Sequence, residues 1–113
     1  MKSPRFLVIG IDGLPYSLLK KLAADDVMPN LKQLMQEGSS KSILSSIPDV
    51  SSTAWTGFMT GTNPGIHGIY GFFDPEPNYK LKFTNFVDIK SEPIWNTLGT
   101  SGNISLIIII PQT

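Results

Sequence analysis

Apolar residues concentrate in three short runs along the chain, at residues 5–11, 41–47 and 104–110. The first run ends at Asp12, the second contains several serines, and the third carries four consecutive isoleucines. A short continuous apolar run is typical of a strand covered on both faces, as in a parallel sheet. We therefore predict three strands, and the isoleucine-rich run gives the clearest of the three signals.

Two helices are predicted between the first and second runs. The first carries an apolar face at helical spacing, formed by Leu18, Leu19, Leu22 and Ala23. Pro29 then breaks the chain, and a second apolar face follows at Leu31, Leu34 and Met35. Gly38 is the expected end of this second helix, because glycine favours the conformation that ends helices.

Residues 51–60 predict a third helix that ends at Gly61. Its expected buried face consists of Ala54, Trp55, Phe58 and Met59. Intrinsic helix propensity is poor here because the segment contains Thr53, Thr56 and Gly57. Tertiary packing or function must therefore hold this helix in place.

The remaining signals lie in the second half of the chain. Asn63-Pro64-Gly65 is a strong turn signal. Residues 79–84 alternate apolar and polar side chains, which predicts a half-exposed strand or an extended arm. Residues 93–98 predict a short helix with proline near its start, followed by Gly99.

The order strand, helices, strand, helix, helix, strand predicts an α/β fold, a mostly parallel sheet with helices on both faces. No repeat or linker divides residues 1–113, so we expect them to belong to one domain. Nothing follows the isoleucine-rich strand to cover it, and an uncovered strand of this kind is prone to aggregate. Either this strand lies between the earlier two, or the domain is incomplete in this chain; we expect the second.

Composition narrows the range of partners. Nine Lys+Arg balance nine Asp+Glu, so charge gives no reason to expect a nucleic acid or an anionic membrane surface as a partner. Without cysteine, neither a disulfide nor a thiolate metal site is possible. The first apolar run is interpreted as a strand rather than a signal peptide, and the last is too short to span a bilayer. We expect a cytoplasmic protein without a membrane segment.

Asp12 occupies a position where α/β proteins place functional groups, at the carboxyl end of the first predicted strand. A carboxylate there, followed by Gly13, suits a metal or a phosphate group, although such an Asp can also simply cap a turn. A haloacid-dehalogenase-type phosphatase would need an Asp where Leu14 stands. A Rossmann dinucleotide site would need a Gly-x-Gly-x-x-Gly string, which is absent.

Ser51 begins the helix that follows the second predicted strand. Helix N-termini bind phosphate groups well, but a serine there is also an ordinary N-cap. No histidine lies close in sequence to remove the proton of its hydroxyl. Ser51 therefore makes chemical sense as a nucleophile only with a metal ion beside it.

A series of motifs occurs in a fixed order along nearly the whole chain. The motifs are Val8-Ile9-Gly10-Ile11-Asp12-Gly13, Met28-Pro29-Asn30-Leu31 with Leu34 and Gly38, Ser51 to Trp55, Thr60-Gly61-Thr62-Asn63-Pro64-Gly65-Ile66-His67-Gly68-Ile69, and Pro93-Ile94-Trp95 with Leu98, Gly102 and Pro111. Together they resemble the type I phosphodiesterase/nucleotide pyrophosphatase branch of the alkaline phosphatase superfamily. The specific part is the Thr-Gly-x-x-Pro-x-x-His-Gly-Ile string, placed at a fixed distance after a Ser or Thr.

This resemblance implies an alkaline-phosphatase-like core and the hydrolysis of small-molecule phosphate esters or nucleotide-like substrates. It implies that Asp12 binds one of two divalent metal ions, with zinc expected. Counting back from Thr60, the family's nucleophile falls on Ser51, which would also contact metal and form a covalent phospho-enzyme intermediate. The backbone of Ser52 would bind substrate. The only histidine, His67, corresponds to a structural residue of the family.

The chain departs from the nucleotide pyrophosphatases in two places. They have Phe-Pro-Asn-His after the nucleophile, and this chain has Ser52-Thr53-Ala54-Trp55. Counting also places Phe72 where those enzymes have an asparagine that contacts phosphate. A nucleotide substrate therefore does not follow from the resemblance.

The supply of metal ligands bears on whether the site is complete. Each zinc ion usually takes roughly three or more protein ligands, and this chain offers one histidine. The family supplies its other Asp and His ligands beyond Thr113, so we expect this chain to be inactive by itself. Our second hypothesis is accordingly a truncated, non-catalytic fragment or partial domain. An unrelated α/β binding module is a third, which requires the motif order to be coincidence.

Overall fold

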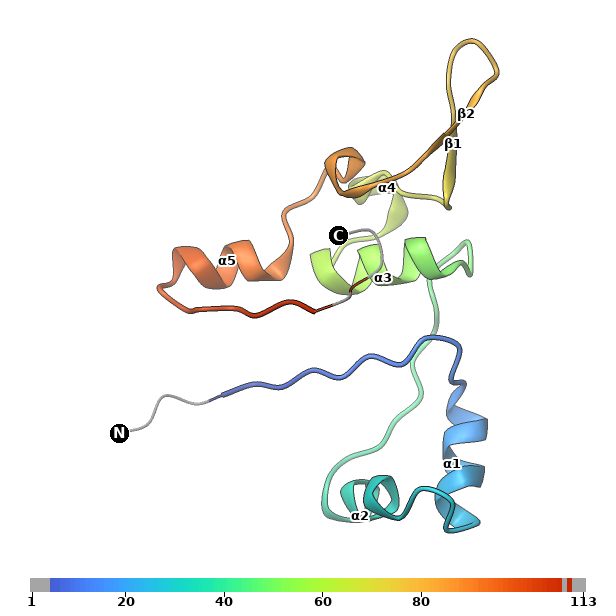
Figure 1. The fold of residues 1–113 in the computed structure, drawn as a ribbon, viewed down its shortest axis with the longest axis vertical. Helices are drawn as coiled ribbons and strands as arrows, with labels where there is room; N and C mark the ends of the chain where they lie inside the picture. The colour runs from blue at the N-terminus through green and yellow to red at the C-terminus, as the bar shows by residue number, and fades with distance from the viewer. Residues whose placement is uncertain (1–4, 109, 111–113) are drawn as a thin grey trace. The chain divides into compact units, whose positions relative to one another are not determined.

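A computed structural model describes residues 5–108 and residue 110 of the chain. The chain divides into two compact units, Met1–Ile43 and Leu44–Thr113, and each is described by itself. The described residues form five α-helices, one short 3-10 helix and one two-stranded antiparallel sheet (Figure 1). The coarse prediction that helices and strands occur together is thus confirmed.

The first unit contains two helices, α1 (Tyr16–Ala24) and α2 (Pro29–Glu37), where the spacing of apolar residues predicted them. α2 begins with a proline, which suits the first helical position because no backbone N–H is needed there. It ends at Gly38, whose N–H donates to the Leu34 carbonyl at 2.9 Å. Ala23 is the buried residue of α1, and α1 contacts α2.

The second unit contains α3 (Ser51–Thr60), α4 (Pro64–His67) and α5 (Ile94–Thr100), together with β1 (Phe73–Pro75), β2 (Leu81–Phe83) and the 3-10 helix η1 (Phe86–Asp88). α3 has the predicted bounds, and Gly61 ends it with a φ of 66°, in the left-handed region that glycine adopts readily. The predicted turn at residues 63–65 becomes the first part of α4. The predicted end of α5 before Gly99 is wrong, because the helix continues to Thr100.

β1 and β2 form a hairpin in which Phe73 lies opposite Phe83, with ring centroids 4.4 Å apart. Every residue of both strands is exposed. The predicted strand is therefore present. The prediction that one of its faces would be buried is wrong, and the alternative prediction of an extended arm is correct. The reason is that the hairpin extends beyond the rest of its unit, so no layer covers either face (Figure 1).

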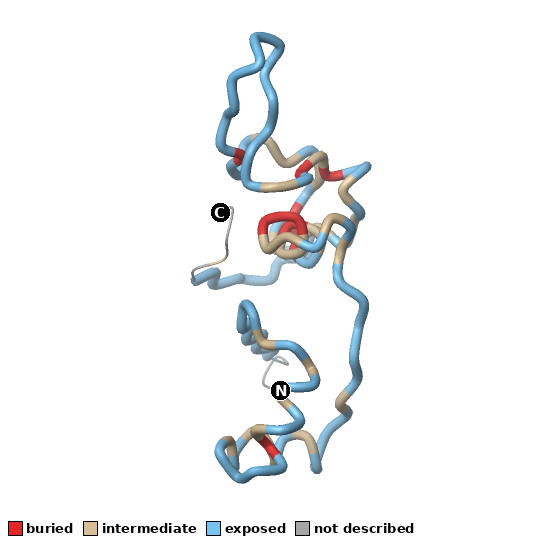
Figure 2. Tube along the Cα trace, turned by 90° about the vertical axis from the view of Figure 1, so that its right-hand side faces the viewer, coloured by how far each residue is buried: buried red, intermediate tan, exposed pale blue. Residues whose placement is uncertain are grey.

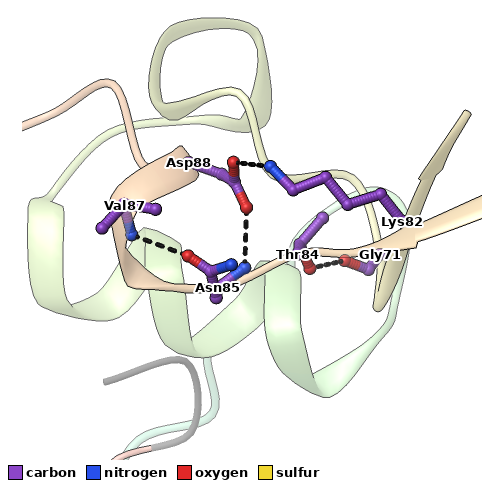
Figure 3. Close-up of polar contacts among 6 residues, drawn as sticks. All are labelled: Gly71, Lys82, Thr84, Asn85, Val87 and Asp88. Carbon is purple, nitrogen blue, oxygen red and sulfur yellow. Dashed lines mark hydrogen bonds and ion pairs between the residues drawn. The ribbon is translucent and has the colours of Figure 1, made fainter. Parts of the chain in front are cut away.

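The base of the hairpin is fixed by a small polar cluster (Figure 3). The Lys82 ammonium pairs with the Asp88 carboxylate, which also accepts from the Asn85 N–H at 2.9 Å. These contacts raise the pKa of Lys82 and lower the pKa of Asp88. The Thr84 hydroxyl donates to the Gly71 carbonyl at 2.8 Å. The cluster holds the hairpin to η1 and has a structural role.

The three predicted strands are not formed among the described residues. Residues 5–11, 41–47 and 104–108 have no strand assignment, and residue 109 lies outside the described part of the chain. The side chains of Phe6, Leu44 and Ile104 are 94%, 97% and 100% exposed. Strands need a hydrogen-bonded neighbour, and no strand partner for these runs is found among residues 5–108 and 110. The predicted parallel sheet, with helices on both faces, is therefore not seen there.

The core of the second unit is small and partly polar. Its fully buried side chains come from α3 and from the segment around α4: Ser52, Thr53, Thr56, Met59, His67 and Ile69 (Figure 2). Of the predicted apolar face of α3, only Met59 is buried, while Phe58 is 56% exposed. That prediction is wrong because α4 and the loop before it pack on the side of α3 that carries Gly57. An added Cβ there would lie 3.3 Å from the Thr62 carbonyl oxygen and 3.9 Å from His67 Nε2.

None of the helices among the described residues combines the length and the apolar character needed to cross a bilayer.

Candidate functional site

Ser51 is the first residue of α3. The N-cap position is occupied by Val50, whose backbone is extended and which makes no side-chain capping bond. The interpretation of Ser51 as an ordinary N-cap is therefore wrong. The helix has no acidic side chain in its first turn. The positive end of its dipole is accordingly not neutralised by a neighbouring carboxylate in that turn.

The two adjacent serines differ sharply in exposure. Ser51 is half-buried, whereas Ser52 is fully buried. The Ser52 hydroxyl makes no hydrogen bond within the described part of the chain, and the same holds for the fully buried Thr53 hydroxyl. Of the two serines, only Ser51 can meet a reactant from solvent without local opening of the helix.

Asp12 lies in the turn between the first apolar run and α1, in the first unit, and it is exposed. The following residue, Gly13, has a φ of 69°. Side chains other than glycine adopt this conformation only with strain. The turn thus requires glycine for its backbone. Asp12 and Ser51 belong to different units, so each is placed only within its own unit.

Metal ligands do not gather within the described part of the chain. Among residues 5–108 and 110, no three His, Asp, Glu or Cys side chains lie close enough together to hold an ion. The described residues therefore do not by themselves complete a metal site. Asp12 and Ser51 remain predicted ligands.

His67 ends α4 and is fully buried. Its Nδ1 accepts the Ile69 N–H at 3.1 Å, and its carbonyl accepts the Lys90 N–H at 2.9 Å. Its Nε2 has no partner within the described residues. Burial lowers the pKa of His67, so the imidazole is neutral at pH 7. With Nδ1 engaged and Nε2 buried, this arrangement supports the structural role expected for His67.

A series of hydroxyl groups runs along α3 and was missed by the sequence reasoning. Thr56 Oγ1 donates to the Ser52 carbonyl and Thr60 Oγ1 donates to the Thr56 carbonyl, each at 2.7 Å. The Thr62 hydroxyl lies 2.9 Å from that of Thr60 and 3.2 Å from that of Ser91. The four-residue spacing of Ser52, Thr56 and Thr60 was the available signal, since such residues share one helix face.

The second unit also has an open hollow, lined by residues 44–47 and 61–65 together with Gly57 and Tyr70. Ser51 and Ser52 do not line it. The hollow therefore gives no support to the predicted site.

The family model described as "Type I phosphodiesterase / nucleotide pyrophosphatase" matches residues 6–113, almost the entire chain. No curated protein and no solved structure matches the chain.

Proposed function

The chain belongs to the type I phosphodiesterase/nucleotide pyrophosphatase family, and from this premise we propose that Ser51 is the nucleophile of a metal-dependent phosphate-ester hydrolase. Membership suggests a hydrolase of the phosphodiesterase or pyrophosphatase type, with small phosphate esters as substrates. The identity of the nucleophile, the metal ions and the covalent intermediate are the parts that we propose.

The single observation that carries the proposal is the difference between Ser51 and Ser52. Ser51 starts α3 and retains solvent exposure, whereas Ser52 is fully buried. A phosphate ester is a large polar reactant, so it reaches Ser51 far more readily than Ser52. The motif spacing counted back from Thr60 selects the same serine.

The start of α3 also suits the substrate's phosphate group. The first backbone N–H groups of a helix have no intrahelical acceptor and lie at the positive end of the dipole. Val50 carries no side-chain oxygen that could occupy these N–H groups. We propose that the backbone N–H of Ser52 binds a phosphate oxygen of the substrate.

The proposed chemistry proceeds in two displacements at phosphorus. Ser51 Oγ loses its proton and attacks phosphorus, and the leaving alcohol or phosphate departs with the electron pair of the broken P–O bond. This produces a phosphoseryl intermediate. Water then attacks phosphorus, the bond to Ser51 Oγ breaks, and the serine recovers its proton.

We propose that Asp12 and Ser51 contribute ligands to two divalent metal ions, with zinc as the proposed metal. Such ions lower the pKa of bound hydroxyl groups and stabilise negative charge on phosphoryl oxygens. Because the described residues do not complete a metal site, the other ligands would come from further residues of the complete protein. We propose that the same further residues would allow residues 5–11, 41–47 and 104–110 to pair as strands in the parallel sheet of an alkaline-phosphatase-like domain.

The substrate class stays broad in this proposal. Phe72 stands where nucleotide pyrophosphatases have a phosphate-contacting asparagine, and its side chain is 44% exposed. A phenyl ring cannot donate a hydrogen bond to phosphate. We therefore propose a small phosphate ester without assigning a nucleotide, and we propose the cytoplasm as the location.

A second candidate is that the 113-residue chain acts only as a non-catalytic part of such an enzyme. Two observations favour it. No metal-binding cluster is found among residues 5–108 and 110, and the apolar runs there are largely exposed. This chain alone would then bind no zinc and hydrolyse nothing.

The test compares two single-atom deletions in the protein expressed from its complete gene. Ser51→Ala should abolish metal-dependent hydrolysis of bis-para-nitrophenyl phosphate, whereas Ser52→Ala should retain it, because only Ser51 supplies the attacking oxygen. A chelator should remove the activity and zinc should restore it. Retained turnover in Ser51→Ala would overturn the assignment. Metal analysis of the 113-residue chain by itself tests the second candidate.

A further inference from the structure

The start of α3 has neither a side-chain capping bond from its N-cap, Val50, nor an acidic residue in its first turn. Its first backbone bond runs from the Ala54 N–H to the Val50 carbonyl at 2.9 Å. Serine, threonine and glycine, all of modest helix propensity, make up much of the helix. The helix therefore has little intrinsic stability, and Ser51 is its first residue.

Side-chain hydroxyls add hydrogen bonds to the carbonyl groups of this helix. Thr56 Oγ1 donates to the Ser52 carbonyl and Thr60 Oγ1 donates to the Thr56 carbonyl, each at 2.7 Å. The Thr62 hydroxyl lies 2.9 Å from Thr60 Oγ1 and 3.2 Å from Ser91 Oγ. We call Thr56, Thr60, Thr62 and Ser91 the hydroxyl chain. It connects the first turn of α3 to a residue far along the sequence.

The far end of the hydroxyl chain is itself anchored. Ser91 follows Lys90, whose backbone N–H donates to the His67 carbonyl at 2.9 Å. The Lys90 side chain also lies against Gly68, where an added Cβ would come within 3.0 Å of it. Residues 90–91 are therefore held both to the end of α4, through Lys90, and to Thr62 just after α3, through Ser91.

We propose that the hydroxyl chain positions Ser51, with Thr56 as the residue through which it acts; this inference rests on the proposed function of Ser51 as nucleophile. The bond from Thr56 fixes the carbonyl of Ser52, the residue directly after Ser51. It opposes the unwinding of the first turn that would let the Ser51 hydroxyl drift from its attacking position. Misplacement by roughly an ångström can lower a rate by about two orders of magnitude.

Thr53 is also fully buried in α3, but its hydroxyl makes no hydrogen bond within the described part of the chain, and the carbonyl four residues before it, that of Asp49, lies outside the helix. Threonine often donates to the carbonyl four residues earlier, and a single bond of that kind carries little meaning. Here two such bonds follow one another and continue to Ser91, and Thr56 is shielded from competing water.

The experiment uses the protein expressed from its complete gene and compares Thr56→Val with Thr53→Val and Thr56→Ser. Both valine variants replace a buried threonine of α3 with a side chain of nearly the same shape, and only one breaks a hydrogen bond. With bis-para-nitrophenyl phosphate, Thr56→Val should lower kcat about tenfold or more and leave KM within about twofold. Thr53→Val and Thr56→Ser should stay within about twofold of wild type in both constants.

Three kinetic results would overturn the inference. The first is wild-type kcat in Thr56→Val. The second is an equal loss of kcat in Thr53→Val, and the third is a similar loss in Thr56→Ser, since either of these would indicate a general packing effect rather than a hydroxyl effect.

Hydrogen exchange at the Ala54 amide tests whether the hydroxyl chain positions Ser51, independently of whether Ser51 is the nucleophile. This amide makes the first backbone bond of α3. Thr56→Val should increase its exchange rate about tenfold relative to Thr53→Val, because the first turn opens more often. If wild type hydrolyses nothing but this increase is found, the chemistry fails and the placement of Ser51 by the hydroxyl chain stands. Unchanged exchange overturns the placement.

Discussion

Replacing Ser52 by alanine should stabilise the protein and leave its activity intact. The Ser52 hydroxyl is fully buried and has no hydrogen-bond partner within the described residues. An unpaired buried polar group costs about 1–3 kcal/mol. Alanine also exceeds serine in helix propensity by about 0.5 kcal/mol. The backbone carbonyl that accepts from Thr56 is unchanged by the substitution.

The loss of one oxygen atom leaves only a small void, so the favourable contributions dominate. We therefore expect the free energy of unfolding of Ser52→Ala to rise by about 1–3 kcal/mol. Urea unfolding followed by circular dichroism, at a fixed zinc concentration, measures this difference. Ser101→Ala is the matched control, because that serine is exposed at the end of α5 and donates to the Thr97 carbonyl at 3.2 Å. Its effect should stay within about 0.5 kcal/mol.

Two outcomes would refute the reasoning on Ser52. Destabilisation by more than about 1 kcal/mol would indicate that the hydroxyl makes a hydrogen bond in the folded state, since the void left by one oxygen atom is too small to account for a loss of that size. Loss of hydrolysis in Ser52→Ala, with activity retained in Ser51→Ala, would assign the nucleophile to the buried serine and would require the start of α3 to open during turnover.

Two further predictions concern the segment that packs on α3. Burial lowers the pKa of His67 below its usual 6.5, so the unfolded chain takes up the proton first as the pH falls. Stability present above pH 6.5 is therefore lost as the pH falls below that value. In urea unfolding across that range, His67→Asn should remove this dependence on pH. Gly68→Ala should destabilise by about 1–2 kcal/mol, because Gly68 has a φ of 82° and its Cβ would meet the Lys90 side chain at 3.0 Å. Gly61→Ala, with a φ of 66° and no atom within 4 Å, should cost less in the same measurement.

Local signals were sufficient for most of the helices. The bounds of α3 match the prediction because Gly61 adopts the left-handed conformation that ends a helix. Gly38 also ends α2 as predicted, although its φ of −115° is not left-handed. The predicted end of α5 was wrong for a related reason: Gly99 lies inside the helix. A glycine permits a helix to end without compelling it to do so.

The predicted strands depended on information that the apolar runs do not contain. A run such as residues 104–108 indicates that side chains avoid water, but its backbone becomes a strand only beside a hydrogen-bonded partner. Within the described residues that partner is absent, and Ile104 is fully exposed. The hairpin shows the converse. No strand was predicted at Phe73–Pro75, but β1 forms there because β2 is available as its hydrogen-bonded partner.

The prediction of which face of α3 is buried was wrong, because hydropathy ranks aromatic side chains as more buried than hydroxyl side chains. Trp55 and Phe58 were expected inside, and instead Ser52, Thr53 and Thr56 are buried. The close approach of α4 at Gly57 selects the side of the helix that turns inward. The partner at Ser91, which completes the hydroxyl chain, is remote in sequence.

By itself, the sequence determined most of the helices and the order of the motifs. The order and spacing of those motifs indicated the family and predicted Ser51, rather than Ser52, as the nucleophile. Each of these depends on residues close together in the chain or on fixed spacing along it. Only the tertiary structure decided that Ser52 is buried while Ser51 retains exposure, and that a line of hydroxyls connects α3 to Ser91. Burial and long-range hydrogen bonds depend on which segments meet in space, and hydropathy along a single chain does not specify those meetings.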